Sequence, residues 1–333
     1  MTYIATEVID IDQITITNYL TDLGIDNIRK EIIEGLQSEQ KYISSKFFYD
    51  DKGSKLFEDI THLPEYYPTR TEKVLLKKIA PELMSEIKYT DIVELGSGDC
   101  SKISILLNAV KPKNIADITY IPVDVSQSAI QQSAEELVNQ FPDLTINGLV
   151  ADFIHQIDLI PNDNKRMFCF LGSTLGNFDK NIAYNFLHNI SSNMNFGDVF
   201  LLGLDMVKPI EILHHAYNDS KGITSQFNKN IMNVLNEIIQ SDFNLNDFKH
   251  KAFFNEEQSR IEMHLIATKD IIVSSPFSKS EIQFHKGETI HTENSYKYTF
   301  EKIKDIEKIT KLKVDKIFTD SKKWFSLILF QKK

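Results

Sequence analysis

The chain has few cysteines and a shortage of positive charge. Only two cysteines, Cys100 and Cys169, occur among 333 residues, and they fall in different predicted elements. They suggest neither a disulfide framework nor a metal site, and a reducing cytoplasm is the simpler setting. Lysine and arginine number 37 against 47 acidic residues, so the net charge is -10. Because nucleic-acid binding depends on cations that neutralise phosphates, this balance argues against a nucleic-acid partner and favours a small-molecule substrate.

Long apolar runs and a basic leader are also missing. No stretch approaches 18 consecutive apolar residues, and Met1-Thr-Tyr-Ile-Ala has no basic region leading into an apolar core. We therefore expect neither export nor a membrane span, and we expect a monomeric cytoplasmic protein. There is no internal repeat. With 42% hydrophobic and 11% aromatic residues, the chain can bury a sizeable core.

From about residue 72 the chain alternates predicted helices with buried strands. The helices are expected at 72–88, 102–110, 128–140 and 180–194, and the strands at 91–95, 119–123, 144–151, 167–171 and 199–204. Mostly apolar strands between helices are typical of an α/β fold, a parallel sheet covered on both faces. The closing segments 314–320 and 324–330 predict an antiparallel hairpin at the sheet edge.

A second module interrupts this rhythm after Asp205. Residues 209–241 read as mainly helical, and 249–273 as two strands, with period-two alternation in Arg260-Ile-Glu-Met-His-Leu-Ile. The first 70 residues, which include an amphipathic helix at 27–37, are expected to pack with this module. The predicted domains are thus a sheet domain, 70–207 with 298–333, and a second α+β domain, 10–69 with 208–297.

The most informative segment is Ile92-Val-Glu-Leu-Gly96-Ser-Gly98, in which an apolar strand runs into a Gly-x-Gly turn. Glycines let the backbone approach a ligand, and the helix that follows presents unpaired N–H groups. A dinucleotide fingerprint needs a third glycine where this chain has Ser101. With Asp124 at the end of the next strand, the pattern fits S-adenosylmethionine better than NAD. Asp124 can accept from both ribose hydroxyls or, alternatively, cap a helix.

Further candidates follow other strand ends, where open α/β sheets bind ligands. Asp152 and Phe153 can accept from the adenine amine and stack on the base, or they are a turn acid and a core aromatic. Lys102 can meet the carboxylate of the methionine moiety, or it is a solvated cation. A cation at a helix N-terminus is unfavourable without an anion, which favours the ligand role.

A second glycine turn, Phe170-Leu-Gly172-Ser-Thr-Leu-Gly-Asn177, follows the fourth strand. Gly172 would allow a substrate to approach closely. Asn177 offers a carbonyl acceptor and two N–H donors, which suit a zwitterionic amino acid, although it can equally cap the next helix.

Aromatic and polar residues elsewhere complete the candidates. Tyr49 and Tyr66 lie in aromatic segments, the second of which is bracketed by prolines that stiffen a loop. They are ligand contacts or core anchors. Glu293 and Ser295 are two residues apart, so on an extended segment their side chains face the same way, whereas the alternative is a solvated turn.

Several of these runs together resemble one known family. They are Phe48-Tyr-Asp-Asp-Lys-Gly-Ser, Leu63-Pro-Glu-Tyr-Tyr-Pro-Thr-Arg-Thr-Glu72, Glu94-Leu-Gly-Ser-Gly98, Phe170-Leu-Gly-Ser-Thr-Leu-Gly-Asn177, Phe227-Asn-Lys-Asn230, Arg260-Ile-Glu-Met263 and His291-Thr-Glu-Asn-Ser295. In this order they look like the histidine-specific Nα-methyltransferases of ergothioneine biosynthesis, from about residue 45 to the C-terminus. The resemblance implies a class I methyltransferase fold, with a substrate domain built from the N-terminus and an insertion.

The resemblance also implies roles for individual positions. Cofactor contacts are implied for the matching residues Gly96, Lys102, Asp124, Asp152 and Phe153, and the sequence itself adds Gly98. The substrate's amino and carboxylate groups are implied to lie near Tyr66, Gly172, Asn177 and Tyr217. The imidazole end of the pocket is implied at Tyr49, Met263, Glu293 and Ser295. Relatives that methylate tryptophan derivatives need no acid facing an imidazole, so the Glu293 and Ser295 pair favours L-histidine.

The expected reaction is direct displacement at a sulfonium methyl group by the neutral α-amine, repeated up to three times to give hercynine. Tyr66 or water would accept each proton, and Asn177 and Tyr217 would hold the carboxylate. No metal is required. The alternatives are the same reaction on another aromatic amino acid such as tryptophan, a non-catalytic S-adenosylmethionine-binding protein, and an NAD-dependent oxidoreductase, which Ser101 disfavours.

Overall fold

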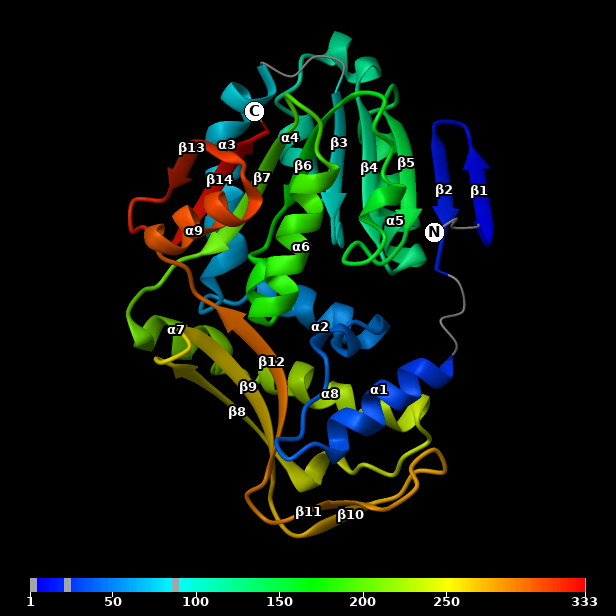
Figure 1. Cartoon of the computed structure of the whole chain (residues 1–333), viewed down its shortest axis with the longest axis vertical. Coiled ribbons are helices and arrows are strands. Elements are labelled where there is room, and N and C mark those ends of the chain that lie inside the picture. Colours follow the sequence, from blue (N-terminus) through cyan, green and yellow to red (C-terminus); the bar gives the residue numbers. More distant parts are fainter. Residues whose placement is uncertain (1–4, 21–24, 86–89, 333) are drawn as a thin grey trace. The chain divides into compact units, whose positions relative to one another are not determined.

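A computed structural model of the chain describes residues 5–20, 25–85 and 90–332. It divides into two compact units (Figure 1). The first unit comprises residues 1–21, 71–206 and 298–333, and the second comprises 22–70 and 207–297. Among the described residues, no helix combines the length and the apolar composition needed to cross a membrane.

The first unit is built on one nine-stranded sheet in the order β1-β2-β5-β4-β3-β6-β7-β14-β13 (Figure 1). The strands are listed here with their bounds: β1 (Glu7–Ile11), β2 (Ile14–Asn18), β3 (Thr90–Leu95), β4 (Thr119–Asp124), β5 (Thr145–Val150), β6 (Lys165–Phe170), β7 (Val199–Asp205), β13 (Lys313–Thr319) and β14 (Phe325–Gln331). Strands β2 to β7 are mutually parallel. The chain order reverses at β3, as in a doubly wound fold, and this reversal is where such sheets bind ligands.

Helices cover both faces of this sheet because the buried strands are apolar on both sides. One hydrophobic cluster contains residues of α3 (Tyr67–Ser85), α4 (Ile103–Leu107) and α5 (Gln127–Gln140). The other contains residues of α6 (Lys180–Asn193) and α9 (Phe300–Thr310). Within β3, Ile92 belongs to the first cluster and Val93 to the second, so neighbouring side chains point to opposite faces.

The predicted C-terminal hairpin is confirmed, because β14 pairs antiparallel with both β13 and β7, and β13 is the edge strand. The expectation that the whole N-terminal region packs with the insertion is wrong for residues 5–20, which belong to the first unit. There β1 and β2 form a hairpin whose second strand pairs parallel with β5, from Ile14 opposite Ile146 to Asn18 opposite Val150. Ile16, which is only 1% exposed, packs with Ile130 and anchors this hairpin on the sheet.

The second unit combines helices with a three-stranded antiparallel sheet in the order β12-β9-β8. Its elements are α1 (Ile25–Gln37), η1 (Ser45–Phe48), α2 (Asp51–Thr61), α7 (Ile210–Tyr217), α8 (Ile223–Ile238), η5 (Leu245–Asp247), β8 (Phe248–Asn255), β9 (Arg260–Ala267), β10 (Ile271–Val273), β11 (Ile282–Phe284) and β12 (Thr289–Tyr296). The strand predicted from the alternation at 260–266 is confirmed as β9.

Polar side chains, most of them buried, tie the elements of the second unit together. Asp50 caps α2 by accepting from the Gly53 N–H at 2.7 Å and also accepts from the Asn230 amide of α8 at 2.7 Å. Asn228 of α8 donates to the His264 carbonyl at 3.1 Å and accepts from the Thr292 hydroxyl at 2.7 Å. Through these bonds α8 holds α2 on one side and both β9 and β12 on the other.

Candidate functional site

The first glycine turn follows β3 and has the backbone that the sequence predicted. Gly96 and Gly98 have φ angles of 64° and 49°, a left-handed conformation that other residues rarely adopt. The Asp124 carboxylate, at the end of β4, accepts from the Gly98 N–H at 3.2 Å and from the Ser126 N–H at 3.0 Å. Burial raises the pKa of Asp124. The alternative role of Asp124 as a helix cap is wrong, because Ser126 caps α5.

Asp152 and Phe153 follow the end of β5 in the chain, and the Phe153 ring lies beside this turn. The Asp152 carboxylate accepts from the Ile154 N–H at 3.0 Å and contacts the His155 ring at 2.7 Å. The Phe153 ring lies 3.6 Å from the position that a Cβ atom on Gly96 would occupy. The same ring packs on the aromatic core, so it combines a core anchor with a surface beside the turn.

Lys102 is not the solvated cation that one alternative proposed. It is 21% exposed and forms an ion pair at 3.1 Å with Glu72, which is fully buried. Burial disfavours the charge of Lys102, but the Glu72 and Glu94 carboxylates outweigh that effect and raise its pKa. Glu72 also accepts from the Gly172 N–H at 2.8 and 3.0 Å, and thereby connects the two glycine turns of the first unit.

Gly172 is required where it stands. Its φ is 78°, and a Cβ atom added there would lie 2.9 Å from the Lys102 ammonium. Asn177 is the last residue of η4 (Thr174–Asn177) and is half-buried. Its alternative role as a helix cap is wrong, because Asp179 occupies the N-cap position of α6. The hydrogen bond from the Gly172 N–H to Glu72 holds this turn in place.

A second buried acid supports the same region. Burial raises the pKa of Glu94 to about 8, and the Tyr120 hydroxyl donates to this carboxyl group at 2.6 Å. Glu94 precedes Gly96 by two residues on β3. Two buried carboxyl groups thus lie close to the glycine turn. Glu72 is paired with Lys102, and Glu94 is hydrogen-bonded to Tyr120.

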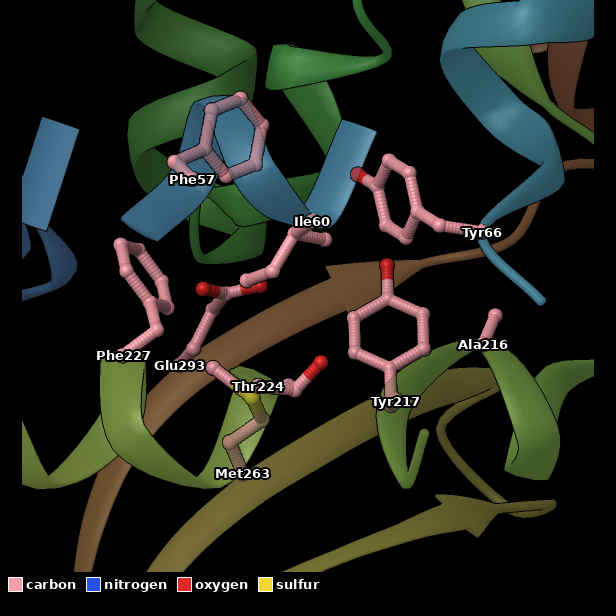
Figure 2. Close-up of a pocket in the computed structure, with 9 residues that line it drawn as sticks. All are labelled: Phe57, Ile60, Tyr66, Ala216, Tyr217, Thr224, Phe227, Met263 and Glu293. Atoms are coloured by element: carbon pink, nitrogen blue, oxygen red, sulfur yellow. The ribbon is translucent and has the colours of Figure 1, made fainter. Parts of the chain in front are cut away.

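The second unit contains a pocket of its own, shown in Figure 2. It encloses about 260 Å³, including its open mouth, and its lining is mostly aromatic and aliphatic. The lining residues are Phe57, Ile60, Tyr66, Ala216, Tyr217, Thr224, Phe227, Met263 and Glu293. Four residues predicted at widely separated sequence positions, Tyr66, Tyr217, Met263 and Glu293, are therefore brought together around one space.

Of the two predicted tyrosines, Tyr66 lines the pocket and Tyr49 packs against residues of its lining. Tyr66 immediately precedes α3, so the expected proline-bracketed loop is shorter than predicted and its second proline, Pro68, lies in the first turn of that helix. The Arg70 guanidinium donates to the Leu63 and Pro64 carbonyls and holds this loop. Tyr49 is outside the lining but contacts the rings of Phe57 and Phe227 at 5.7 and 5.9 Å between centroids.

Glu293 is the acidic group in this lining. Burial raises its pKa to about 7, and the charge of Lys297 opposes the increase. Glu293 and Ser295 both lie on β12, so they are on an extended strand, as their spacing requires, and the solvated-turn alternative is wrong. Ser295 is 5% exposed and accepts from the Tyr217 hydroxyl at 2.8 Å.

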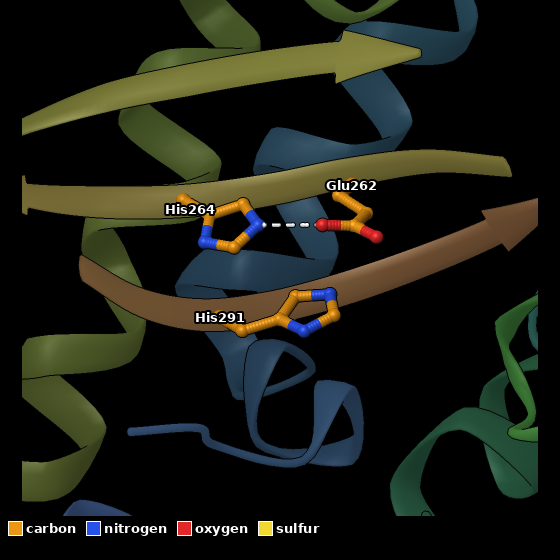
Figure 3. A group of neighbouring side chains, drawn as sticks. All are labelled: Glu262, His264 and His291. Atoms are coloured by element: carbon orange, nitrogen blue, oxygen red, sulfur yellow. Dashed lines mark hydrogen bonds and ion pairs between the residues drawn. The ribbon is translucent and has the colours of Figure 1, made fainter. Parts of the chain in front are cut away.

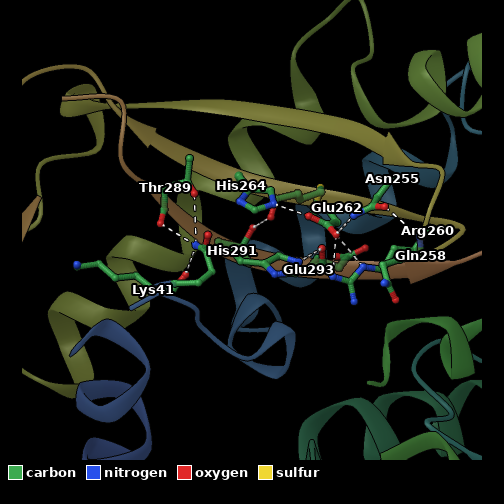
Figure 4. Close-up of polar contacts among 12 residues, drawn as sticks. Lys41, Asn255, Gln258, Arg260, Glu262, His264, Thr289, His291 and Glu293 are labelled. Atoms are coloured by element: carbon green, nitrogen blue, oxygen red, sulfur yellow. Dashed lines mark hydrogen bonds and ion pairs between the residues drawn. The ribbon is translucent and has the colours of Figure 1, made fainter. Parts of the chain in front are cut away.

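A neighbouring cluster, Glu262, His264 and His291, has the residue types of a metal site (Figure 3). The two histidine rings are stacked, 4.6 Å apart and 8° from parallel, so their in-plane lone pairs do not converge on one point. Glu262 already accepts from His264, Arg260 and Asn255, as Figure 4 shows. Although burial opposes its charge, these bonds lower the pKa of Glu262 to about 2. The geometry is that of a structural network on β9, and we assign no metal to it.

Sequence reasoning missed several residues that shape these sites. Glu72 was visible only as the end of a motif, and its bond to Gly172 joins positions 100 residues apart. Thr224 lines the pocket from the first turn of α8, where no local signal marks it, and Phe227 of the same helix was noted only as the start of a motif. Lys297 continues the two-residue spacing of Glu293 and Ser295, and that alternation could have identified it.

The doubly wound sheet, its antiparallel closing hairpin and the glycine turn with Asp124 are those of a class I methyltransferase. A sequence model described as "Histidine-specific methyltransferase, SAM-dependent" matches residues 28–332. The chain belongs to this family.

Curated relatives agree in length and in activity class. The histidine N-alpha-methyltransferase of Mycobacterium tuberculosis is 36% identical over 287 residues, covering 86% of this chain and 89% of that protein. The histidine N-alpha-methyltransferase of Mycolicibacterium smegmatis is 35% identical over 291 residues, covering 87% and 90%. The 4-dimethylallyltryptophan N-methyltransferase easF of Aspergillus fumigatus is 28% identical over 316 residues, covering 90% and 89%. The protein is thus an S-adenosylmethionine-dependent amino-acid methyltransferase.

Proposed function

We propose that the protein transfers methyl groups to the α-amine of L-histidine, up to three times, to give hercynine. The observation that carries this proposal is the Glu293 carboxyl group in a pocket otherwise lined mainly by aromatic and aliphatic side chains. Glu293 is half-buried, and an acid enclosed by apolar side chains is costly unless it meets a hydrogen-bond donor. The N–H of an imidazole ring is such a donor, and Ser295 on the same strand would donate to the other ring nitrogen.

The residues of the first unit fit S-adenosylmethionine. The left-handed glycines remove the side chains that would fill the turn, Phe153 offers a ring beside Gly96, and Asp124 offers carboxylate oxygens for ribose hydroxyls. When bound, S-adenosylmethionine supplies an electrophilic methyl group on a sulfonium that is a good leaving group. We propose that Gly96, Gly98, Lys102, Asp124, Asp152 and Phe153 hold it, with Lys102 remaining tied to Glu72.

The chain's own residues would align the amine and remove its protons. Only a neutral amine has a lone pair for displacement, so each methylated ammonium product must lose its proton before the next transfer. We propose Tyr66, whose ring lines the pocket, or a water molecule as the acceptor of that proton. Asn177 would orient the substrate by donating to its carboxylate, as would the Tyr217 hydroxyl. Gly172 would leave room for the substrate.

The alternative is methylation of another aromatic amino acid, such as tryptophan or a derivative, as the name of the easF relative indicates for that protein. An indole has an N–H but no ring acceptor, so it would leave one polar pocket group without a partner. We favour histidine because Glu293 and Ser295 together match a ring with one donor and one acceptor.

The proposal is tested by incubating the full chain and S-adenosylmethionine with L-histidine, its Nα-monomethyl and Nα-dimethyl forms, or L-tryptophan, followed by mass spectrometry. We expect all three histidine forms to be methylated and the trimethylated product to accumulate. Methylation of tryptophan without methylation of histidine would contradict the proposal. Accumulation of a monomethyl product alone would contradict trimethylation but not the choice of histidine.

A further inference from the structure

Lys297 is a buried cation that contacts Tyr217, one of the residues lining the pocket of the second unit. Its side chain is 0% exposed, and it follows β12 with the same spacing that separates Glu293 from Ser295. Its backbone is fixed on both sides, because its N–H donates to the Ser259 carbonyl at 2.8 Å and its carbonyl accepts from the Ser259 hydroxyl at 3.2 Å. The ammonium group therefore has a defined position in the second unit.

The ammonium donates to the hydroxyl of Tyr217, which lines the pocket, and to that of Ser295, which lies outside the lining but is hydrogen-bonded to Tyr217. Lys297 Nζ lies 2.8 Å from Ser295 Oγ and 3.2 Å from Tyr217 Oη, and the two oxygens are 2.8 Å apart. An ammonium can only donate, whereas a hydroxyl has one proton and two lone pairs. Each oxygen therefore accepts from Lys297, and the proton of each hydroxyl is directed away from it.

We propose that Lys297 is a positioning residue that fixes the hydrogen-bond polarity of the pocket by making the hydroxyls of Tyr217 and Ser295 donors toward the amino-acid substrate. This inference rests on the proposed function, in which these hydroxyls meet the carboxylate and the imidazole ring. In the structure, Tyr217 donates to Ser295. A substrate that offers two acceptors can take both protons while Lys297 keeps both oxygens hydrogen-bonded.

The charge of Lys297 also acts on Glu293, where it favours a hydrogen-bond acceptor rather than a donor. Burial raises the pKa of Glu293, and the positive charge of Lys297 opposes that increase, so it favours the ionised form that accepts a hydrogen bond. One buried charge thus favours an acceptor at Glu293 and donors at Ser295 and Tyr217. A neutral imidazole, with one N–H and one ring lone pair, matches this arrangement.

The decisive substrates are the two pyrrolylalanine isomers, which keep a ring N–H but have no ring acceptor. With the wild-type protein, histidine should be preferred over both by about 100-fold or more in kcat/KM, because a site built to hydrogen-bond a group rejects analogues that lack it. Lys297→Met removes the charge and the donors, so Ser295 can turn its lone pairs toward the ring. The preference for histidine should then decrease by about tenfold or more.

Lys249→Met is the matched control, because Lys249 is an exposed lysine on β8 of the same sheet. It should leave the preference unchanged. An unchanged preference in Lys297→Met would overturn the inference, even if stability or total activity fell. A wild-type protein that methylates histidine and the pyrrole analogues equally well would overturn it too. If the wild type does not methylate histidine at all, the proposed function itself has failed.

Ser295→Ala provides a second variant if Lys297→Met does not fold. It should lower the preference for histidine over pyrrolylalanine to a similar extent, and an unchanged preference overturns the inference. Where both variants fold, the double variant Ser295→Ala, Lys297→Met should lose no more of the preference than either single variant, because Lys297 acts through Ser295. Fully additive losses would show that Lys297 acts independently of Ser295.

Discussion

Replacing Glu293 by glutamine should stabilise the empty protein at neutral and alkaline pH. The side chain keeps its size, so the substitution leaves no cavity and changes only the charge. In an unstructured chain the carboxyl group has its ordinary pKa of 4.5, whereas burial raises the pKa of Glu293 to about 7 in the folded protein. The difference corresponds to about 3 kcal/mol in the free energy of unfolding, as an upper value.

The sign follows from proton binding. Between about pH 4.5 and pH 7 the folded state holds a proton on Glu293 that the unfolded state has released. The wild type therefore loses stability as the pH rises through this interval, and above it the loss is complete. Glutamine does not titrate, so the variant should match the wild type near pH 4 and exceed it by up to about 3 kcal/mol at pH 8.

The assay is urea denaturation of both proteins, without ligands, across this pH range. Glu256→Gln, an exposed glutamate in the turn between β8 and β9, is the control and should show no such trend. The reasoning is refuted if the difference between Glu293→Gln and the wild type is independent of pH, or if the variant is the less stable protein at pH 8. Histidine turnover should fall by about tenfold, because a neutral amide replaces a charged acceptor.

Three further predictions concern the roles of individual residues. Glu293→Ala should lower kcat/KM for histidine and raise it for tryptophan, and Met263→Val should enlarge the pocket and strengthen this change in specificity. The rates are measured by mass spectrometry, and an unchanged ratio of the two kcat/KM values would show that Glu293 does not distinguish the substrate rings. In calorimetry the wild type should bind S-adenosylmethionine and its demethylated product but not NAD, and Asp124→Ala should weaken S-adenosylmethionine binding by roughly 1.5 to 3 kcal/mol. Tight binding of NAD without any binding of S-adenosylmethionine would contradict the proposed cofactor site. Asn177→Ala should impair histidine turnover and leave cofactor affinity nearly intact; a variant that misfolds, with normal kinetics in its folded fraction, would indicate a structural role instead.

Much of the first unit could be predicted from the sequence because its strands are continuous apolar runs. Strand β3, for example, is buried at all six positions, and its glycine turn is marked by residue type. Strands β1 and β2 were not predicted, because they are partly exposed and gain their pairing from β5, far along the chain. Helix α4 is shorter than expected, since the chain forms tight turns from Asn108 to Val110.

The sequence predicted those parts of the site whose residues are a short, regular distance apart in the chain. The two-residue interval between Glu293 and Ser295 is enough to place them on one side of a strand. The ion pair between Glu72 and Lys102 and the pocket contact of Thr224 depend on tertiary packing, which leaves no local pattern. The roles of the site residues toward cofactor and substrate stay predictions.

The central claim is that this pocket selects histidine, and a competition experiment tests it most directly. Equal concentrations of histidine, tryptophan, tyrosine and phenylalanine are incubated with S-adenosylmethionine and the full chain, and the methylated products are quantified at low conversion. The product ratio then equals the ratio of kcat/KM values. We expect methylated histidine to exceed every other product by about 100-fold or more. A mixture in which tryptophan or another amino acid receives most of the methyl groups would contradict the account.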